Sequence, residues 1–381
     1  MIGGVFLCRR RSVTLFHPPP THPTDKNICA ISVVIPVYNT EKYIGATIES
    51  ILNQTFQDFE IIVVDDCSTD KSCEVVKNYI SKFGNKIKLF STKENSGGPG
   101  TPSNLGFSFA QGKYIFFMDN DDLIANNMLE NLYKLGEETQ AEVIYMDKGF
   151  MFDTNPSNPF PQQSELSLRA WQQGGIVEKP ELETENIVER VQKFCRTEFG
   201  WPAWEKLVRR DFLLKNKIVF PEINSSGDVA WSMLIYLLAK KIVRAPQPFY
   251  YYRQHPTSVM HKERTPEETI DFWLTINAKG LTFLEKFLND QEFFKNNPQY
   301  LFELLNFFEK VNFQLVANIF VNLPPTELFK VNEIIKPSFE KIFGEHGNFI
   351  SYVFTQLNNL RGKSILNEHK AMELENKLKA L

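Results

Sequence analysis

Acidic side chains stand at two points of this sequence where an apolar, strand-like run ends. Glu60–Asp66 reads EIIVVDD, Lys113–Asp122 reads KYIFFMDNDD, and the terminal acids are Asp65, Asp66, Asp119, Asp121 and Asp122. Two acids at one strand end can hydrogen-bond a nucleoside, and a D-x-D pair at another can hold a divalent metal that bridges a diphosphate. One acidic strand end alone is more often a helix cap or a solvated turn. Their joint order along the chain predicts a nucleotide site built from carboxylates.

The elements that would position these acids alternate along residues 31–150. Ile31–Val37 is a continuous, mainly β-branched run, as expected for a strand buried on both faces. We expect further strands at Glu60–Asp66, Lys86–Ser91, Lys113–Asp122 and Ala141–Asp147. We expect helices at Tyr43–Gln54, Ser72–Phe83 and Asn127–Thr139, and a short helix that ends at Ala110. Such alternation predicts a mostly parallel sheet with crossover helices. Folds of this kind bind ligands outside the carboxyl ends of the strands, where the acids fall.

Two familiar phosphate loops are excluded. Gly106–Tyr114, GFSFAQGKY, has five residues between its glycines, and Tyr114 stands where Ser or Thr should bind magnesium. It also precedes a strand, whereas a P-loop precedes a helix. After the first strand the chain reads P-V-Y-N in place of a glycine-rich dinucleotide fingerprint. The sequence therefore predicts neither an ATP-binding P-loop nor a standard NAD site.

Composition narrows the class of protein. The 381 residues are 43% hydrophobic and 23% charged, a normal globular mixture, and the net charge of −4 argues against nucleic acid as a partner. Five cysteines without C-x-x-C favour reduced thiols in a cytosolic chain over a disulfide scaffold or a structural zinc site. No apolar run approaches the ~20 residues that a bilayer crossing needs. We expect residues 1–28 to be a flexible leader or an overlong translation start.

Five motifs together resemble a known family. VVIPVYNTEKYIGATIESILNQTFQDFEIIVVDDCSTD and NSGGPGTPSNLGFSFAQGKYIFFMDNDD look like the nucleotide-binding half of the inverting family 2 glycosyltransferases with the GT-A fold. The resemblance continues in WPAWEKLVRRDFLLKNKIVFPE, SGDVAWSMLIYLLAKK and PQPFYYYRQHPTSV, and covers roughly Ile31–Val259. It implies an α/β GT-A domain over 29–263, with a Rossmann-like, mostly parallel sheet. The nucleotide-binding half would be 31–150 and the acceptor half 151–263, followed by a helical C-terminal region over 264–381.

The resemblance also implies an activity. We expect inverting transfer of a sugar from a nucleoside diphosphate sugar, expected to be a UDP-sugar, to a hydroxyl of a glycan or glycolipid acceptor. The cofactor would be Mn²⁺ or Mg²⁺, and the setting bacterial cell-surface polysaccharide synthesis, such as lipopolysaccharide or capsule, in the cytoplasm or at the inner face of its membrane. Two alternatives stay open: a sugar-nucleotide-binding scaffold without turnover, and a nucleotidyltransferase, which the C-terminal motifs fit poorly.

Donor contacts carry over motif by motif. Pro36 and Tyr38 match the positions that pack the nucleotide base, with Tyr38 offering a stacking face, although both could simply shape a turn. Asp66 matches the acid that hydrogen-bonds the base. Asp121 is the first choice as metal ligand. Asp119 would either contact the ribose or support the metal ligands without touching the metal.

Other donor contacts lie in loops. Asn104 falls in the stretch that normally reads A-R-N-x-G, and Ser103 stands where that Arg is usual, so a basic donor contact is missing or supplied elsewhere. Arg253 and His255 match a segment that closes over the diphosphate, where His255 could reach the metal. His255 could equally be a turn residue before Pro256. Asp122 is expected to cap the following helix.

The second half carries the acceptor and base functions. Trp201–Lys206 resembles the segment lining the acceptor pocket, where Trp201 or Trp204 could stack on a sugar face or instead belong to the core. Asp228 occupies the acid position of the family's E-D motif, the catalytic base, and Gly227 stands where Glu is common. The alternative for Asp228 is a helix N-cap.

From about Arg264 the pattern changes to amphipathic helices. Tyr300–Val321 carries one apolar stripe interrupted by charges, so it is not a transmembrane segment. Four leucines near the end fit a loose heptad: Leu360, Leu374, Leu378 and Leu381. Three roles stay open for this region: a lid on the catalytic domain, a homodimer contact, or peripheral contact with a membrane surface. The insertion Thr154–Thr197 has no readable motif and is expected to form an acceptor-side flap.

Overall fold

The computed structural model describes residues 29–146, 148–153, 169–172, 178–254 and 265–322. Contacts divide the chain into two compact units, which are described separately. The first comprises residues 1–262 and 282–307, and the second comprises residues 263–281 and 308–381. The candidate site residues that the structure describes all lie in the first unit.

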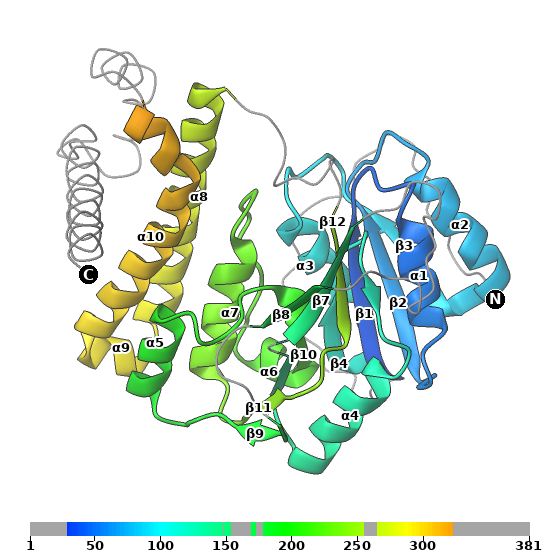
Figure 1. The fold of residues 1–381 in the computed structure, drawn as a ribbon, viewed down its shortest axis with the longest axis horizontal. Helices are drawn as coiled ribbons and strands as arrows, with labels where there is room; N and C mark the ends of the chain where they lie inside the picture. The colour runs from blue at the N-terminus through cyan, green and yellow to red at the C-terminus, as the bar shows by residue number, and fades with distance from the viewer. Residues whose placement is uncertain (1–28, 147, 154–168, 173–177, 255–264, 323–381) are drawn as a thin grey trace, which may run out of the picture. The chain divides into compact units, whose positions relative to one another are not determined.

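Four parallel strands form the nucleotide-binding side of the main sheet. They pair in the order β3-β2-β1-β4 (Figure 1), and every residue of β2 is buried. Buried β-branched runs of this kind are what a sheet covered on both faces requires. The prediction of a mostly parallel sheet is confirmed. The strands are β1 (Cys29–Val37), β2 (Phe59–Asp65), β3 (Ile87–Ser91) and β4 (Gly112–Phe117).

The other half of this eight-stranded sheet comes from later in the chain. Strand β10 (Lys206–Arg209) pairs antiparallel with both β4 and β6 (Val143–Met146). Beyond them, β11 (Ile242–Ala245) runs parallel to β6, and β9 (Glu181–Leu182) closes the edge antiparallel. Because β10 lies beside β4, the segment Trp201–Lys206 is brought next to the acids that follow β4.

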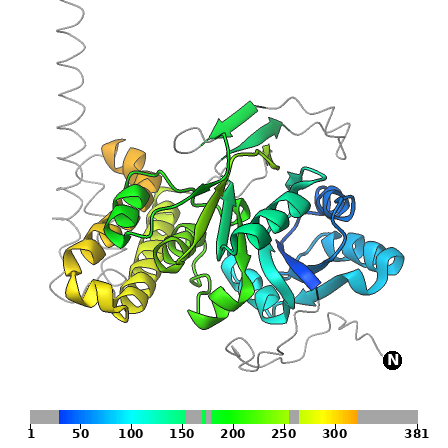
Figure 2. The same cartoon turned by 90° about the horizontal axis from the view of Figure 1, so that it is seen from below.

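A smaller sheet of four strands adjoins the same acids. Its order is β5-β12-β7-β8, where β12 pairs antiparallel with β5 and parallel with β7. The pair β7–β8 runs side by side at one end of it (Figure 2). Its strands are β5 (Leu123–Ile124), β7 (Lys148–Asp153), β8 (Arg169–Gln172) and β12 (Tyr250–Gln254). Pairing with β5 holds Arg253 close to the turn that follows β4.

Helices cover both faces of the main sheet (Figure 2). Val33 and Ile35 of β1 belong to one buried cluster with Ile48 of α1 and Leu132 of α4. The alternate side chains of β1 and β2 face α3, where a Cβ on Gly106 would lie 2.5 Å from Val34 Cγ1. Gly106 is therefore required for close packing of helix on strand. The helices are α1 (Ile44–Leu52), α2 (Ser72–Phe83), α3 (Gly100–Phe109) and α4 (Met128–Thr139).

Later helices complete the first unit. α7 (Gly227–Leu238) packs against α5 (Ile187–Cys195) and the 3-10 helix η3 (Ala203–Glu205), and α6 (Arg210–Lys215) against β4 and β10. A second 3-10 helix, η1 (Gly84–Lys86), follows α2. Phe307 places its ring edge-on to Phe194, with centroids 5.6 Å apart, so residues 282–307 form part of this core.

The remaining helices are α8 (Pro266–Asn289), α9 (Glu292–Asn296) and α10 (Pro298–Asn322). In the second unit, Trp273 of α8 meets Phe313 of α10 edge-on, with ring centroids 5.8 Å apart. Within the described part of the chain, no helix combines the length and apolar character needed to cross a bilayer. The predicted helix over Tyr300–Val321 is confirmed, whereas the leucines from Leu360 onward lie outside the described residues.

Candidate functional site

The turn after β4 carries three acids, Asp119, Asp121 and Asp122, and is pinned from two sides. Thr47 of α1 donates its hydroxyl to the carbonyls of Asn120, at 3.0 Å, and Asp122, at 2.9 Å. Asn120 Nδ2 donates to Pro36 O of β1 at 2.6 Å. Since Pro36 lies at the carboxyl end of β1, these bonds fix the acids at the edge where parallel strands end.

Asp122 ties this turn to β12. Its side chain is fully buried, and its carboxylate accepts hydrogen bonds from Tyr250 Oη and from Arg253 N, both at 2.7 Å. The expectation that Asp122 caps the next helix is wrong, because α4 begins at Met128, six residues later. The acid instead anchors the backbone of the strand that carries Arg253.

Arg253 is buried beside the turn, at 2% exposure, with its Nε donating to Asp121 O at 2.5 Å. Its guanidinium carbon lies 5.1 Å from the ring centre of Tyr43 and 4.8 Å from that of Phe152. Both terminal nitrogens, Nη1 and Nη2, are buried and find no hydrogen-bond partner among the described residues. Unpaired buried donors are costly, so this arrangement is suited to receive an acceptor such as a phosphate oxygen.

Negative charge accumulates around the turn. Burial, followed by the charges of Asp121 and Asp228, raises the pKa of Asp119 to about 8. Burial, followed by the charges of Asp121 and Asp119, raises the pKa of Asp122 well above its usual value. A bound cation would relieve this repulsion, and carboxylate oxygens are the ligands that Mg²⁺ and Mn²⁺ prefer.

The donor set therefore suits a hard divalent cation. Over the described ranges, however, no three His, Cys, Asp or Glu side chains are grouped to hold a metal ion. His255, the second predicted metal ligand, lies outside the described residues. The metal assignments of Asp121 and His255 stay predictions.

The predicted base pocket lies at the ends of β1 and β2. Tyr38 is 46% exposed there, which leaves a ring face open for stacking, while Pro36 is buried. Asp66 is buried, and its carboxylate accepts from Thr92 Oγ1 at 2.7 Å and from both the N–H and the hydroxyl of Ser96 at 2.9 Å. Asp66 thus holds the glycine-rich loop in place, and its contact with a base stays a prediction.

Asn104 is engaged with a distant backbone. Its Nδ2 donates to Phe220 O at 2.9 Å, and its Oδ1 accepts from Phe220 N at 2.8 Å. This pair joins α3 to the segment that leads into α7, across 116 residues of sequence. Ser103, where the resemblance expects Arg, is buried at 4% exposure. The nucleotide contact predicted for Asn104 is untested, and in the structure its amide joins helix α3 to the backbone of Phe220.

Asp228 lies in the first turn of α7 and is partly buried. Its Oδ1 accepts from the adjacent Val229 N at 3.0 Å, and the residue that precedes the helix is Ser226, in a left-handed conformation with φ 58°. The alternative that Asp228 is the N-cap is therefore not what the structure shows. Burial raises the pKa of the Asp228 carboxyl, and the positive charge of Lys206 opposes that shift.

The two predicted acceptor tryptophans have different surroundings. Trp204 is 7% exposed and stacks on Tyr250, with ring centroids 4.0 Å apart and planes 11° from parallel. Trp201 is half-buried, with its ring edge-on to Phe307 and its Nε1 buried without a partner among the described residues. Both residues precede β10, and Trp204 is the more deeply buried of the two.

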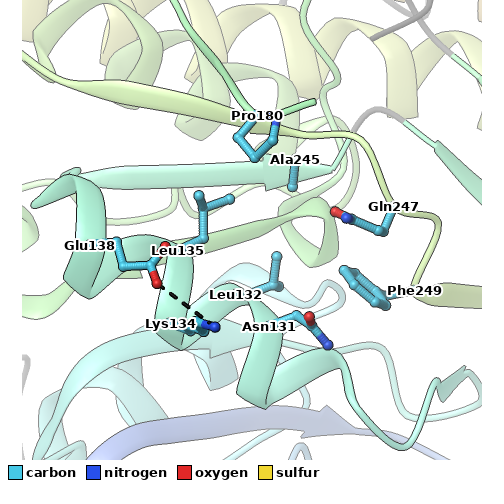
Figure 3. Close-up of a pocket in the computed structure, with 9 residues that line it drawn as sticks. All are labelled: Asn131, Leu132, Lys134, Leu135, Glu138, Pro180, Ala245, Gln247 and Phe249. Atoms are coloured by element: carbon cyan, nitrogen blue, oxygen red, sulfur yellow. Dashed lines mark ion pairs between the residues drawn. The ribbon is translucent and has the colours of Figure 1, made fainter. Parts of the chain in front are cut away.

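A separate pocket lies between α4 and the segment after β11 (Figure 3). None of the predicted site residues lines it, and its two charged side chains, Lys134 and Glu138, pair with each other at 3.8 Å. The lining residues are Asn131, Leu132, Lys134, Leu135, Glu138, Pro180, Ala245, Gln247 and Phe249. The pocket therefore has no part in the chemistry of the acidic edge.

Sequence comparison finds the family described as Glycosyl transferase family 2, whose model matches residues 32–197. "Glycosyltransferase GlyG" of Streptococcus pneumoniae is 35% identical over 236 residues, 61% of this chain and 73% of that protein. "Poly(ribitol-phosphate) beta-glucosyltransferase" of Bacillus spizizenii is 35% identical over 225 residues, 58% of this chain and 32% of that protein. This chain thus spans about a third of the second relative.

Among solved structures, residues 1–349 of Staphylococcus aureus TarS in complex with UDP-GlcNAc are similar to this chain. The TM-score is 0.59 at 26% sequence identity, covering 82% of this chain and 81% of that one. The same fragment in complex with UDP gives a TM-score of 0.54 at 27% identity, over 78% of this chain and 77% of that one. The likeness extends over most of both chains.

Proposed function

Because this chain belongs to the family 2 glycosyltransferases and its relatives are glycosyltransferases, we propose that it transfers a sugar with inversion from a nucleoside diphosphate sugar to a hydroxyl of a glycan or glycolipid acceptor. The observation that carries this proposal is the acidic turn after β4. It is held beside a buried arginine whose terminal nitrogens find no partner among the described residues, and close to a partly buried aspartate. These groups are suited to bind a diphosphate and to accept a proton.

The donor is proposed to be a UDP-sugar. Support comes from the similar TarS structures with UDP and UDP-GlcNAc. The base would stack on the exposed Tyr38 next to Pro36 and hydrogen-bond Asp66, while Asp119 would face the ribose. Asn104 would support the site indirectly, by joining α3 to the segment that leads into Asp228.

The diphosphate is proposed to lie against Arg253. Its Nη1 and Nη2 are desolvated and without partners among the described residues, so a phosphate oxygen would gain two charge-assisted hydrogen bonds there. This buried arginine could supply the basic contact that Ser103 does not. Asp121 and His255 would hold Mn²⁺ or Mg²⁺, which offsets charge on a leaving diphosphate when bound.

The chemical step follows from one base and one displacement. Asp228 takes the proton of the acceptor hydroxyl as that oxygen attacks the anomeric carbon from the face opposite the diphosphate. The new carbon–oxygen bond forms, the bond to the diphosphate breaks with its electron pair leaving on the nucleotide, and the configuration inverts. A positioned base of this kind contributes about 10²–10⁴-fold.

The acceptor is proposed to be part of a bacterial surface glycan, because the names of two relatives specify poly(ribitol-phosphate). Trp201 and Trp204 would line its pocket, with Trp201 the better placed to meet a sugar because it is less buried. We further propose a cytoplasmic enzyme whose C-terminal helices contact a membrane surface or a second copy. A chain ending at Asn322 keeps α8, α9 and α10 and removes residues 323–381. Comparing its vesicle co-sedimentation and measured mass with those of the full chain tests whether residues 323–381 make either contact.

A non-catalytic scaffold is the alternative class, kept by Ser103 and Gly227 at positions where Arg and Glu are usual. The test is to incubate the protein with a panel of UDP- and GDP-sugars and Mn²⁺, and to measure nucleoside diphosphate release with EDTA as control. We expect release from a UDP-sugar that EDTA abolishes. Binding of a nucleotide sugar with no release from any donor, with or without glycan acceptors, would favour the scaffold.

A further inference from the structure

A buried ion pair that sequence analysis did not assign stands at the start of β10. The side chains of Glu205 and Lys206 are both completely buried, with Lys206 Nζ 3.4 Å from Glu205 Oε2. The ammonium also donates to Pro202 O at 2.7 Å and lies 5.0 Å from the ring centre of Phe199. Burying two charges is expensive and rarely adds stability over an apolar pair. A pair retained at this cost suggests a role beyond holding the fold.

The fold makes room for this pair at Gly200. A Cβ at that position would lie 1.7 Å from Glu205 Oε2 and 2.5 Å from its Cδ. Because the Glu205 side chain is completely buried, its carboxylate has no open direction in which to move away. Gly200 therefore leaves the space that the carboxylate occupies, and the carboxylate in turn faces Lys206.

The segment that carries the pair packs on α7. The 3-10 helix η3, which contains Glu205, packs on α7, and Ser232 of α7 donates its hydroxyl to Trp201 O at 2.5 Å. Ser232 is one helical turn after Asp228, so the two lie on the same side of the helix. The charges that act on Asp228 and its surroundings come from Lys206 of β10 and from Asp119 of the turn after β4.

We propose that Lys206 is a positioning residue for the proposed transfer reaction: its ammonium, held by Glu205 and Pro202, keeps the Asp228 carboxylate ionised and ready to accept a proton. The inference rests on the proposed role of Asp228 as base. Burial raises the pKa of Asp228 and so favours the protonated form, which cannot accept a proton. The charge of Lys206 opposes the effect of burial on the pKa of Asp228. Lys206 does so without donating a hydrogen bond to the carboxylate, which would block it.

The sign of the effect is fixed by the charges. Burial raises the pKa of Asp228, and the Lys206 charge lowers it. Removing that charge therefore moves the pKa of Asp228 upward, and the acidic limb of activity moves with it. Burial lowers the pKa of Lys206 to about 8, so its ammonium is charged over the acidic limb and begins to lose its proton only near pH 8.

The test compares the pH dependence of kcat/KM for donor turnover between about pH 5 and 8 in the wild-type protein and in Lys206→Met. The substitution keeps most of the length of the side chain and removes its charge. We expect the midpoint of the acidic limb to rise by roughly one pH unit, in line with the effect of a nearby opposite charge, with activity recovering at higher pH. A merely structural role would lower activity equally at every pH and leave the midpoint unchanged, which would overturn the proposal.

Two further variants keep the test decisive. If burial of the Glu205 charge without Lys206 prevents Lys206→Met from folding, the double variant Glu205→Gln, Lys206→Met removes both charges with little change in shape and should show the same direction of shift. An unshifted limb in the folded double variant would refute the role of Lys206. Asp228→Asn separates the two proposals. Wild-type activity in this variant refutes Asp228 as the base. Loss of activity in this variant, together with an unshifted acidic limb in the Lys206 variants, refutes the role of Lys206 alone.

Discussion

Substitution of Asn104 by alanine should loosen the connection between helix α3 and the segment that leads to Asp228, the proposed catalytic base. The amide forms two hydrogen bonds with the backbone of Phe220, at 2.8 and 2.9 Å. The two residues are 116 positions apart in the sequence. Phe220 precedes the segment that leads into Asp228. The same segment packs on the glycine-rich loop, where a Cβ on Gly98 would lie 2.8 Å from Ile223 O.

The expected cost can be worked from these contacts. Each net hydrogen bond contributes about 0.5–1.5 kcal/mol, and a backbone group left unpaired in a partly buried place adds to that loss. We expect Asn104→Ala to lower the free energy of unfolding by about 2–4 kcal/mol. Because Asp228 follows the released segment, kcat should also fall, while affinity for UDP changes little.

Urea denaturation, donor turnover and UDP calorimetry of the same preparation measure the free energy of unfolding, kcat and the affinity for UDP. The matched control is Ser108→Ala in the same helix, where the hydroxyl donates only to Leu105 O of its own helix, and the expected change is below about 0.5 kcal/mol. If Asn104→Ala keeps its stability within that margin but loses UDP affinity, Asn104 contacts the nucleotide directly. Its hydrogen bonds to Phe220 then contribute little to stability.

Three further outcomes are expected. Asp121→Ala should abolish metal-dependent turnover and metal-dependent nucleotide binding with the fold intact by circular dichroism; full turnover of this variant in EDTA would contradict the assignment. Asp66→Ala should weaken UDP binding by roughly 1–3 kcal/mol by calorimetry and, because it leaves the Ser96 N–H unpaired, lower thermal stability too; unchanged affinity would remove Asp66 from the site. Truncation after Arg264 should destabilise the first unit, because it removes Phe307 from the core; a truncated chain that melts like the full chain would show that the helices act only as a lid.

The first half of the fold was predictable because its signals are local. The buried run of β1 and the helical spacing in α1, α2 and α4 each lie within one segment, and the predicted ranges agree with the structure to within a few residues. The same reasoning placed the acids at the carboxyl ends of the strands. Parallel strands bring their carboxyl ends together whatever the details of the crossovers, so that placement follows from alternation alone.

The second half was not predictable in this way. Strand β10 has four residues, and its position between β4 and β6 depends on pairing with partners about 60–90 residues earlier, for which a short pattern gives no signal. For the same reason Asp122 was taken for a helix cap: its partners, Tyr250 and Arg253, are 128 and 131 residues away. Lys206 was missed because a charged residue in a short strand normally faces solvent.

Asp228→Asn tests the central claim most directly. Asn keeps the size and the hydrogen bond to Val229 N but cannot take a proton, so turnover should fall about a hundredfold or more while donor affinity and melting temperature stay unchanged. Asp211→Asn, at an exposed acid of α6, is the matched control and should keep full activity. The measurement is nucleoside diphosphate release at saturating donor and acceptor for the three proteins side by side. A stable Asp228→Asn protein that turns over at the wild-type rate would contradict Asp228 as the base.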